Sequence, residues 1–114
     1  MAFNKKEFKV KAGQPVELTF SNTGSSAPLP HNVMVGKAGS KDAIMAASVA
    51  IMTDPAGMTK GYKVETPELL AATRLLNAGE SETITFTPET PGDYPYVCSF
   101  PGHSVMMNGI IKAE

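Results

Sequence analysis

The sequence predicts an all-β sandwich or barrel, and three observations support that prediction. Short segments of alternating apolar and polar residues run through most of the chain. Glycine, proline, asparagine and serine separate these segments, as they do between antiparallel strands. Only residues 40–52 have the spacing of a helix. With 114 residues the chain can bury a core without disulfides, so we expect a single domain over residues 1–114.

The first strands are predicted from this alternation. Phe8 and Val10 alternate with lysines, and residues 16–21 alternate after a turn at residues 13–15. Because neighbouring side chains of a strand point to opposite faces, each apolar set would face the core. We expect two half-buried strands here.

A histidine begins the next predicted strand. His31, Val33 and Val35 would share one face of it, with Asn32 and Met34 on the other. Since the two valines would face the core, we expect His31 to point inward.

The helical segment is expected to pack outside the sheet. Ser40 can cap its N-terminus, and Asp-Pro-Ala-Gly at residues 54–57 ends it. Three apolar residues recur at helical spacing, namely Ile44, Ala47 and Ile51. Residues 57–72 have an irregular pattern, for which we expect a further helix and a loop.

The C-terminal part is predicted to supply the closing strands. Turns are expected at residues 77–80 and 90–93. Because proline cannot donate a ladder hydrogen bond, Pro95 must lie at an edge, a bulge or an outward-facing position. The expected strands are residues 74–76, 83–87, 94–98 and 109–112.

Charge and composition exclude several function classes. Ten basic and eleven acidic side chains leave a net charge of -1, so we expect no nucleic-acid partner. No apolar run has the length of a membrane span, and the N-terminus lacks the apolar stretch of a signal peptide. The single cysteine cannot form an internal disulfide, which leaves one thiol to be explained.

Residues 98–107 gather metal-binding chemistry. They hold the only cysteine, Cys98, one of two histidines, His103, and two of seven methionines. Soft sulfur favours Cu(I), while imidazole also accepts Cu(II), so this donor set suits copper and one-electron redox chemistry. A turn after Cys98 would bring His103 back toward it, and His31 would be a third ligand from a neighbouring strand.

Each of these residues also has an ordinary structural explanation. A lone cysteine is usually a small buried hydrophobe, and a single histidine is more often a core or surface residue than a ligand. Their conjunction favours a metal site. Either Met106 or Met107 could be mere packing, but Met107 lies just before Asn108 and the last predicted strand and is better placed to point into the fold.

The residues resemble the cupredoxins, the type 1 blue-copper proteins, and most closely the azurin and auracyanin branch. Cys98-x4-His103-x3-Met107 has the azurin ligand spacing, His31-Asn32-Val33 looks like the upstream ligand strand, and residues 75–81 resemble a later family segment. The resemblance implies a Greek-key β-sandwich with a helical insertion around residues 40–52. It also implies one type 1 copper ion, with His31, Cys98 and His103 as equatorial ligands and Met107 as the weak axial one.

The same resemblance implies how the ligand segments are held. Asn32 and Ser99 would tie them together, and the backbone amides of Asn32 and Phe100 would approach the cysteine sulfur. Pro30 stands where azurins have the glycine whose carbonyl lies near copper, which leaves an azurin-like fifth contact open. The azurin N-terminal disulfide is absent from this sequence.

The function implied is electron transport by Cu(II)/Cu(I) cycling, not enzymatic turnover. We expect His103 to be the port for the electron, within an apolar surface on which redox proteins dock briefly. That surface would comprise Leu29, Phe100, Pro101, Gly102, Val105 and Met106. We expect a monomer in the periplasm or at the outer face of the cytoplasmic membrane, exported with a leader that is absent from this chain.

Rival functions would use parts of the same site. A copper chaperone or copper-storage protein needs the same soft ligands, and it is the nearest alternative. A thiol hydrolase built on Cys98 and His103 lacks a recognisable third orienting group. Structural zinc is disfavoured because methionine is not a usual zinc ligand.

Overall fold

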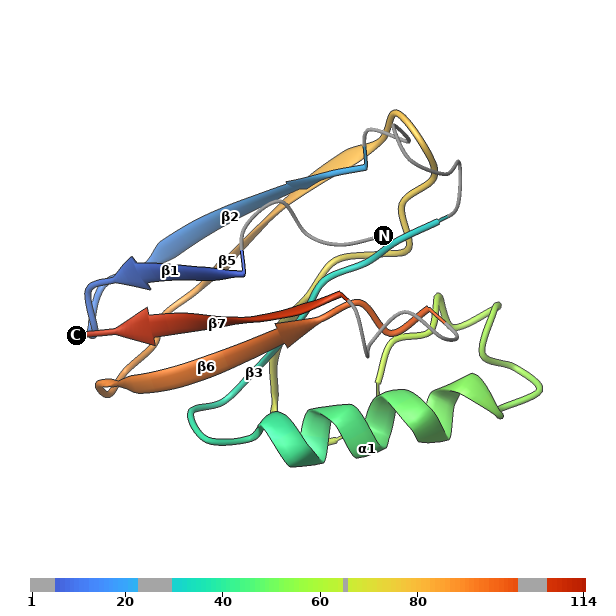
Figure 1. Ribbon diagram of the computed structural model, residues 1–114. Coiled ribbons are helices and arrows are strands. Elements are labelled where there is room, and N and C mark those ends of the chain that lie inside the picture. The colour runs from blue at the N-terminus through green and yellow to red at the C-terminus, as the bar shows by residue number, and fades with distance from the viewer. Residues whose placement is uncertain (1–5, 23–29, 65, 101–106) are drawn as a thin grey trace.

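Two β-sheets and one helix make up the fold in the computed structural model, which describes residues 6–22, 30–64, 66–100 and 107–114 (Figure 1). A five-stranded sheet has the order β1-β7-β6-β3-β4, and a two-stranded sheet pairs β2 with β5. In chain order the elements are β1 (Glu7–Val10), β2 (Val16–Ser21), β3 (Met34–Gly36), α1 (Lys41–Met52), β4 (Leu69–Ala72), β5 (Ser81–Phe86), β6 (Gly92–Val97) and β7 (Asn108–Ala113).

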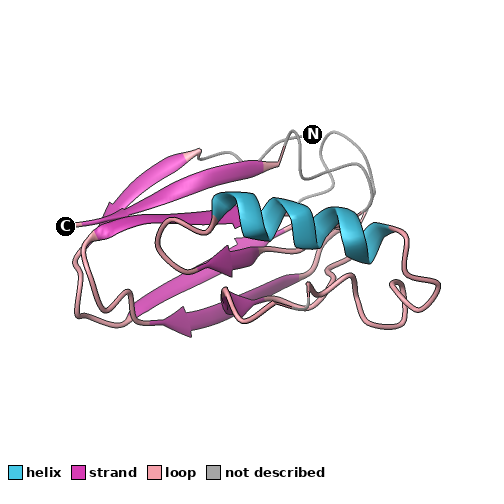
Figure 2. Cartoon of the chain, turned by 90° about the horizontal axis from the view of Figure 1, so that it is seen from below, coloured by secondary structure: helices cyan, strands magenta, loops and turns pink. Residues whose placement is uncertain are grey.

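The larger sheet lies between the β2–β5 pair and helix α1 (Figures 1 and 2). Its face toward β2 and β5 carries the main core, to which Val33, Val35 and Tyr96 belong. Its other face packs on the helix, with Met34 and Val97 against Ile44 and Ile51. Alternate residues of β3 and its flanks therefore face two different cores, as the predicted alternation requires. The expected sandwich with a helix outside the sheet is confirmed.

The N-terminus of α1 differs in detail from the expectation. Ser40 is the residue before the first helical turn, and its carbonyl accepts the N–H of Ile44 at 2.9 Å. Its hydroxyl makes no capping hydrogen bond but donates to the carbonyl of Lys37 at 2.6 Å. The side chain is turned back because β3 and α1 are joined by a tight connection, in which Gly36 lies directly beneath Ser40 and Ile44.

The sequence suggested antiparallel strands throughout, but the larger sheet also contains a parallel pair. β1 and β7 pair in parallel, with Glu7 opposite Ile110 and Val10 opposite Ala113. Parallel neighbours cannot be joined by a tight hairpin. Here the chain passes from β1 to β2, which belongs to the other sheet. The strand beside β1 in the larger sheet is β7, the last strand of the chain.

For the segment from residue 57 to residue 72, a helix and a loop were expected, and the helix is wrong. Its described residues form turns followed by strand β4, with no further helix. All four residues of β4 are partly buried, so the strand lacks the alternation that reveals a half-exposed strand. The strand expected at residues 74–76 is reduced to a single bridge between Leu76 and His31.

Pro95 lies in an interior strand, where it breaks no hydrogen bond of the ladder. It is opposite Ile110 in β7, but the N–H of Ile110 turns away to the carbonyl of Lys6 at 2.9 Å. On the other side, the register with β3 ends at the pair Val35 and Tyr96, so it does not include Pro95. Of the three expected positions, the edge is wrong, because β6 lies between β7 and β3.

Substitution of Gly36 tests the packing of α1 on the sheet. An alanine Cβ there would lie 2.6 Å from Cγ1 of Ile44 and closer still to Oγ of Ser40. Because such overpacking forces packed groups apart, we expect Gly36→Ala to lower the free energy of unfolding by about 1–3 kcal/mol in urea titrations. Lys37→Ala, at the exposed next residue, is the control. Equal stability of both variants would show that α1 shifts freely.

Candidate metal centre

The backbone of His31 is fixed by two hydrogen bonds to Leu76. Its N–H donates to the carbonyl of Leu76 at 2.9 Å, and its own carbonyl accepts the N–H of Leu76 at 2.7 Å. Two residues on, Val33 is bound to Thr73 in the same two-way manner. The N–H of Thr73 donates to the carbonyl of Val33 at 2.9 Å, and the N–H of Val33 donates to the hydroxyl oxygen of Thr73 at 2.9 Å. His31 is 8% exposed, so the inward orientation expected for it is confirmed.

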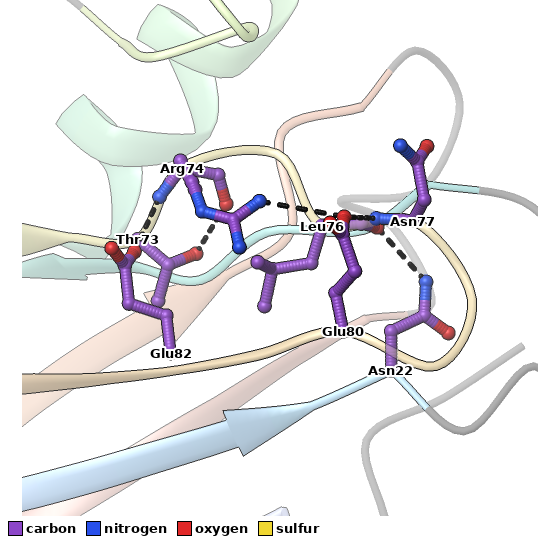
Figure 3. Close-up of polar contacts among 7 residues, drawn as sticks. All are labelled: Asn22, Thr73, Arg74, Leu76, Asn77, Glu80 and Glu82. Atoms are coloured by element: carbon purple, nitrogen blue, oxygen red, sulfur yellow. Dashed lines mark hydrogen bonds and ion pairs between the residues drawn. The ribbon is translucent and has the colours of Figure 1, made fainter.

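A polar network fixes the segment that pairs with His31 (Figure 3). Asn22, which is buried, donates from Nδ2 to the carbonyl of Leu76 at 3.0 Å, the same oxygen that receives the N–H of His31. Its backbone pairs with Glu80 and Gly79 at 2.9 and 2.6 Å. The end of β2 thereby supports the bridge on which His31 sits.

Charged side chains close the turn in that segment. Oε1 of Glu80 accepts the N–H of Asn77 at 2.7 Å and lies 3.4 Å from Nη1 of Arg74 (Figure 3). Both contacts lower the pKa of Glu80, with the Asn77 hydrogen bond the larger cause. Glu82 accepts the N–H of Arg74 at 2.7 Å. The turn predicted at residues 77–80 is therefore present and internally braced.

Cys98 lies directly after the last residue of β6. It continues the inward face of Tyr94 and Tyr96 and is fully buried. Its N–H donates to the carbonyl of Met107 at 2.9 Å, which extends the β6–β7 pairing by one step. Met107 is 3% exposed. The structure thus brings Cys98 beside Met107 at the start of β7.

The side chains of His31 and Cys98 meet, although 67 positions separate them in the sequence. Nδ1 of His31 lies 3.9 Å from Sγ of Cys98. Metal bonds of about 2.0 Å to imidazole nitrogen and about 2.3 Å to thiolate sulfur place two ligands of one ion about 3.5–3.9 Å apart. This buried nitrogen and sulfur pair therefore fits a shared copper ion.

Asn32 and Ser99 join the two segments, as the resemblance implied. The N–H of Ser99 donates to Oδ1 of Asn32 at 2.8 Å, and Nδ2 of Asn32 donates to Oγ of Ser99 at 3.0 Å. Both residues are buried. The residues that follow His31 and Cys98 are thus locked to each other by a two-way hydrogen bond, which we call the Asn32–Ser99 clamp.

The sulfur of Cys98 sits in a buried but polar surrounding. Burial raises the pKa of its thiol, while hydrogen bonds from the backbone amides of Asn32 and Phe100 oppose that shift. The expected approach of these two amides is confirmed. Since the thiolate is the metal-binding form, the same amides stabilise the state that binds a metal ion.

Two further backbone contacts were missed by sequence reasoning. Nδ2 of Asn32 also donates to the carbonyl of Gly61 at 3.1 Å, and the hydroxyl of Ser99 donates to the carbonyl of Tyr62. These acceptors are main-chain oxygens, which no residue pattern reveals. The segment that was expected to pack outside the sheet therefore touches the candidate centre.

Other parts of the expected site lie outside the described residues. These are His103, Met106, and the segment Pro101, Gly102 and Val105, together with Leu29 of the expected apolar surface. Of that surface, Phe100 is described and is partly buried. Within the described residues, no helix has both the length and the apolar character needed to cross a membrane.

Comparison with known proteins agrees with this geometry. The family model of copper binding proteins of the plastocyanin/azurin family matches residues 1–114. Auracyanin-A of Chloroflexus aurantiacus is 34% identical over 96% of this chain and 65% of its own length. An azurin of Pseudomonas chlororaphis is 37% identical over 97% of this chain and 88% of its own length. The chain spans 60 to 65% of the length of auracyanin-A and several other curated relatives.

The fold is also shared with a solved structure. Dithionite-reduced auracyanin from Roseiflexus castenholzii superposes with a TM-score of 0.81 and is 33% identical. The match covers 99% of this chain and 87% of that one. The cupredoxin fold expected from the sequence is therefore confirmed.

Removal of the Asn32 side chain tests the Asn32–Ser99 clamp. Asn32→Ala deletes two buried hydrogen bonds and one partly buried one and leaves the N–H of Ser99 without its acceptor, so we expect a loss of about 2–4 kcal/mol in unfolding free energy. Ser99→Ala keeps that N–H contact and should cost less. Gln14→Ala, at an exposed turn residue, is the control. A cost for Asn32→Ala no larger than for Gln14→Ala would contradict the clamp.

Proposed function

The chain belongs to the plastocyanin/azurin family of copper-binding proteins, so its cofactor is copper, and from this premise we propose that it is an electron carrier. It cycles between the Cu(II) and Cu(I) states and passes single electrons between redox proteins. It turns over no substrate. The observation that supports this proposal most directly is the 3.9 Å approach of His31 Nδ1 to Cys98 Sγ in a buried position.

We propose four ligands for the ion. His31 and Cys98 are the two whose side chains the structure brings together, and Met107 is buried beside Cys98. His103 completes the set on the strength of its spacing from Cys98. His31, Cys98 and His103 would hold the ion as equatorial ligands and Met107 as the weak axial one, as the family resemblance implies for a type 1 site.

The protein contributes rigidity to electron transfer. Copper, when bound, supplies a one-electron couple. His31 is fixed through its bridge to Leu76, and Cys98 through its bond to Met107 and the Asn32–Ser99 clamp. Because both ligands are held by backbone and buried side-chain contacts, they move little when the charge of the site changes. A site that rearranges little exchanges electrons with a small barrier.

The surroundings of the exchange belong to the same proposal. The electron leaves through His103, and redox proteins dock briefly on the apolar surface around it, of which Phe100 is the described member. The carrier works as a single copper-binding domain and as a monomer. We place it in the periplasm or on the outer face of the cytoplasmic membrane, as the family resemblance implies.

A copper chaperone or copper-storage protein is the second candidate, and burial argues against it. Such proteins must exchange metal readily, whereas Cys98 is fully buried and His31 is 8% exposed. Slow exchange of bound copper with a chelator would support the electron carrier. Rapid exchange would favour the chaperone.

Spectroscopy of the copper-loaded protein tests the proposed centre. We expect an intense thiolate-to-copper charge-transfer band in the red that disappears on reduction. Cys98→Ser should abolish this band, because the thiolate is its source. A colourless Cu(II) complex of the unaltered chain would exclude a type 1 site.

The two methionines form a matched pair for the axial position. We expect Met107→Leu to keep the colour and shift the reduction potential, because a weak axial ligand tunes the couple without holding the ion. Met106→Leu should leave the potential unchanged. Potentials measured by redox titration decide between them, and a shift with Met106→Leu alone would make Met106 the axial ligand.

A further inference from the structure

We infer that the turn at residues 56–62 positions the Cys98 segment, and that Tyr62 is the positioning residue through which it acts. The inference rests on the proposed function for its effect on copper, but its contacts belong to the protein alone. In Figure 1 this connection follows α1 and rises toward the end of β6. It contacts Asn32 and Phe100, whose amides approach the sulfur, and Ser99, which is bound to Asn32.

The turn ends in an unusual backbone conformation. Lys60 N–H bonds to the carbonyl of Ala56 at 3.0 Å, and Tyr62 N–H reaches the carbonyl of Gly57 at 2.8 Å. Gly61 and Tyr62 then have positive φ values of 64° and 52°. Within the described residues Tyr62 is the only non-glycine residue with positive φ. A bulky side chain is disfavoured there, so its surroundings must hold it.

The ring of Tyr62 is held from two sides. It meets the ring of Phe100 edge to face, with centroids 5.4 Å apart and planes at 75°. It also lies on the backbone of Gly57, where an added Cβ would be 2.7 Å from Cε1 of Tyr62. The same Cβ would lie 2.8 Å from the carbonyl oxygen of Ile51, so Gly57 packs against the end of α1 as well.

Gly61 and Tyr62, the two residues with positive φ, direct their carbonyls at the Asn32–Ser99 clamp. Gly61 accepts from Nδ2 of Asn32 at 3.1 Å, and Tyr62 accepts the hydroxyl of Ser99. Right-handed backbone at these two residues would direct the carbonyls elsewhere. The strained conformation is thus coupled to the clamp, and the contact between the Tyr62 and Phe100 rings supports both.

These contacts converge on the amides that bond to sulfur. The N–H groups of Asn32 and Phe100 both approach Cys98, and the turn holds the side chain of each. Hydrogen bonds to a ligand atom tune the metal that it binds. Loss of the Tyr62 ring should therefore loosen the Phe100 amide over the sulfur and alter the reduction potential.

A substitution that keeps the backbone but removes the ring tests this role. Asparagine tolerates the left-handed region, so Tyr62→Asn retains both carbonyls, while Tyr62→Phe retains the ring. In metal-free protein, we expect the Cys98 thiol of Tyr62→Asn to react with the disulfide reagent DTNB about tenfold faster than that of the unaltered chain. Tyr62→Phe should react at the unaltered rate.

General destabilisation must be separated from local loosening. Leu18→Ala weakens the main core from the two-stranded sheet, where Leu18 is opposite Ile84, and it should leave the DTNB rate close to that of the unaltered chain. The amide resonance of Phe100, followed by NMR in the same metal-free samples, should shift in Tyr62→Asn and not in Leu18→Ala. An unchanged DTNB rate and an unchanged Phe100 resonance in Tyr62→Asn would overturn the inference.

The copper-loaded variants give the second measurement. We expect Tyr62→Asn to shift the reduction potential and Tyr62→Phe to preserve it. If the thiol and amide measurements respond while the copper form lacks a type 1 spectrum, the positioning role stands and the proposed function fails. If the spectrum is type 1 and the potential is equal in both variants, the role of Tyr62 in tuning copper is excluded.

Discussion

The hydrogen bonds between Asn32 and Ser99 are the constraint on which the candidate centre depends. His31 and Cys98 come from strands that are remote in sequence, and nothing in either segment alone would keep a nitrogen 3.9 Å from a sulfur. The Asn32 side chain satisfies both the amide and the hydroxyl of Ser99. A buried amide side chain that lost these partners would carry a large desolvation cost, so the two segments stay together.

The rest of the fold supports this clamp from three directions. The β3–β6 pairing places the two segments next to each other, since Met34 is opposite Val97. Asn22 and the bridge through Leu76 hold the His31 side. The β7 strand holds the Cys98 side through Met107. Each support uses main-chain hydrogen bonds, which keep the ligand positions independent of most surface side chains.

Much of this arrangement could be predicted from the sequence, because strand alternation and ligand spacing depend only on the order of residue types along the chain. The strands at residues 16–21 and the inward face of His31 follow from alternation. β4 was missed because its four apolar residues, partly buried throughout, show none. The parallel pairing of β1 with β7 and the carbonyls of Gly61 and Tyr62 have no residue signature, since both depend on where distant backbone comes to lie.

The parallel pair at the sheet edge also bears on how the chain is made. β1 precedes β7 by about a hundred residues, yet within the described residues β7, which spans residues 108–113, is its one partner in the larger sheet. Contacts between residues so far apart in sequence form slowly and late. The pairing of β1 in this sheet therefore forms only after β7 has been made. Because β7 directly follows Met107, the segment that completes the larger sheet also carries a proposed copper ligand.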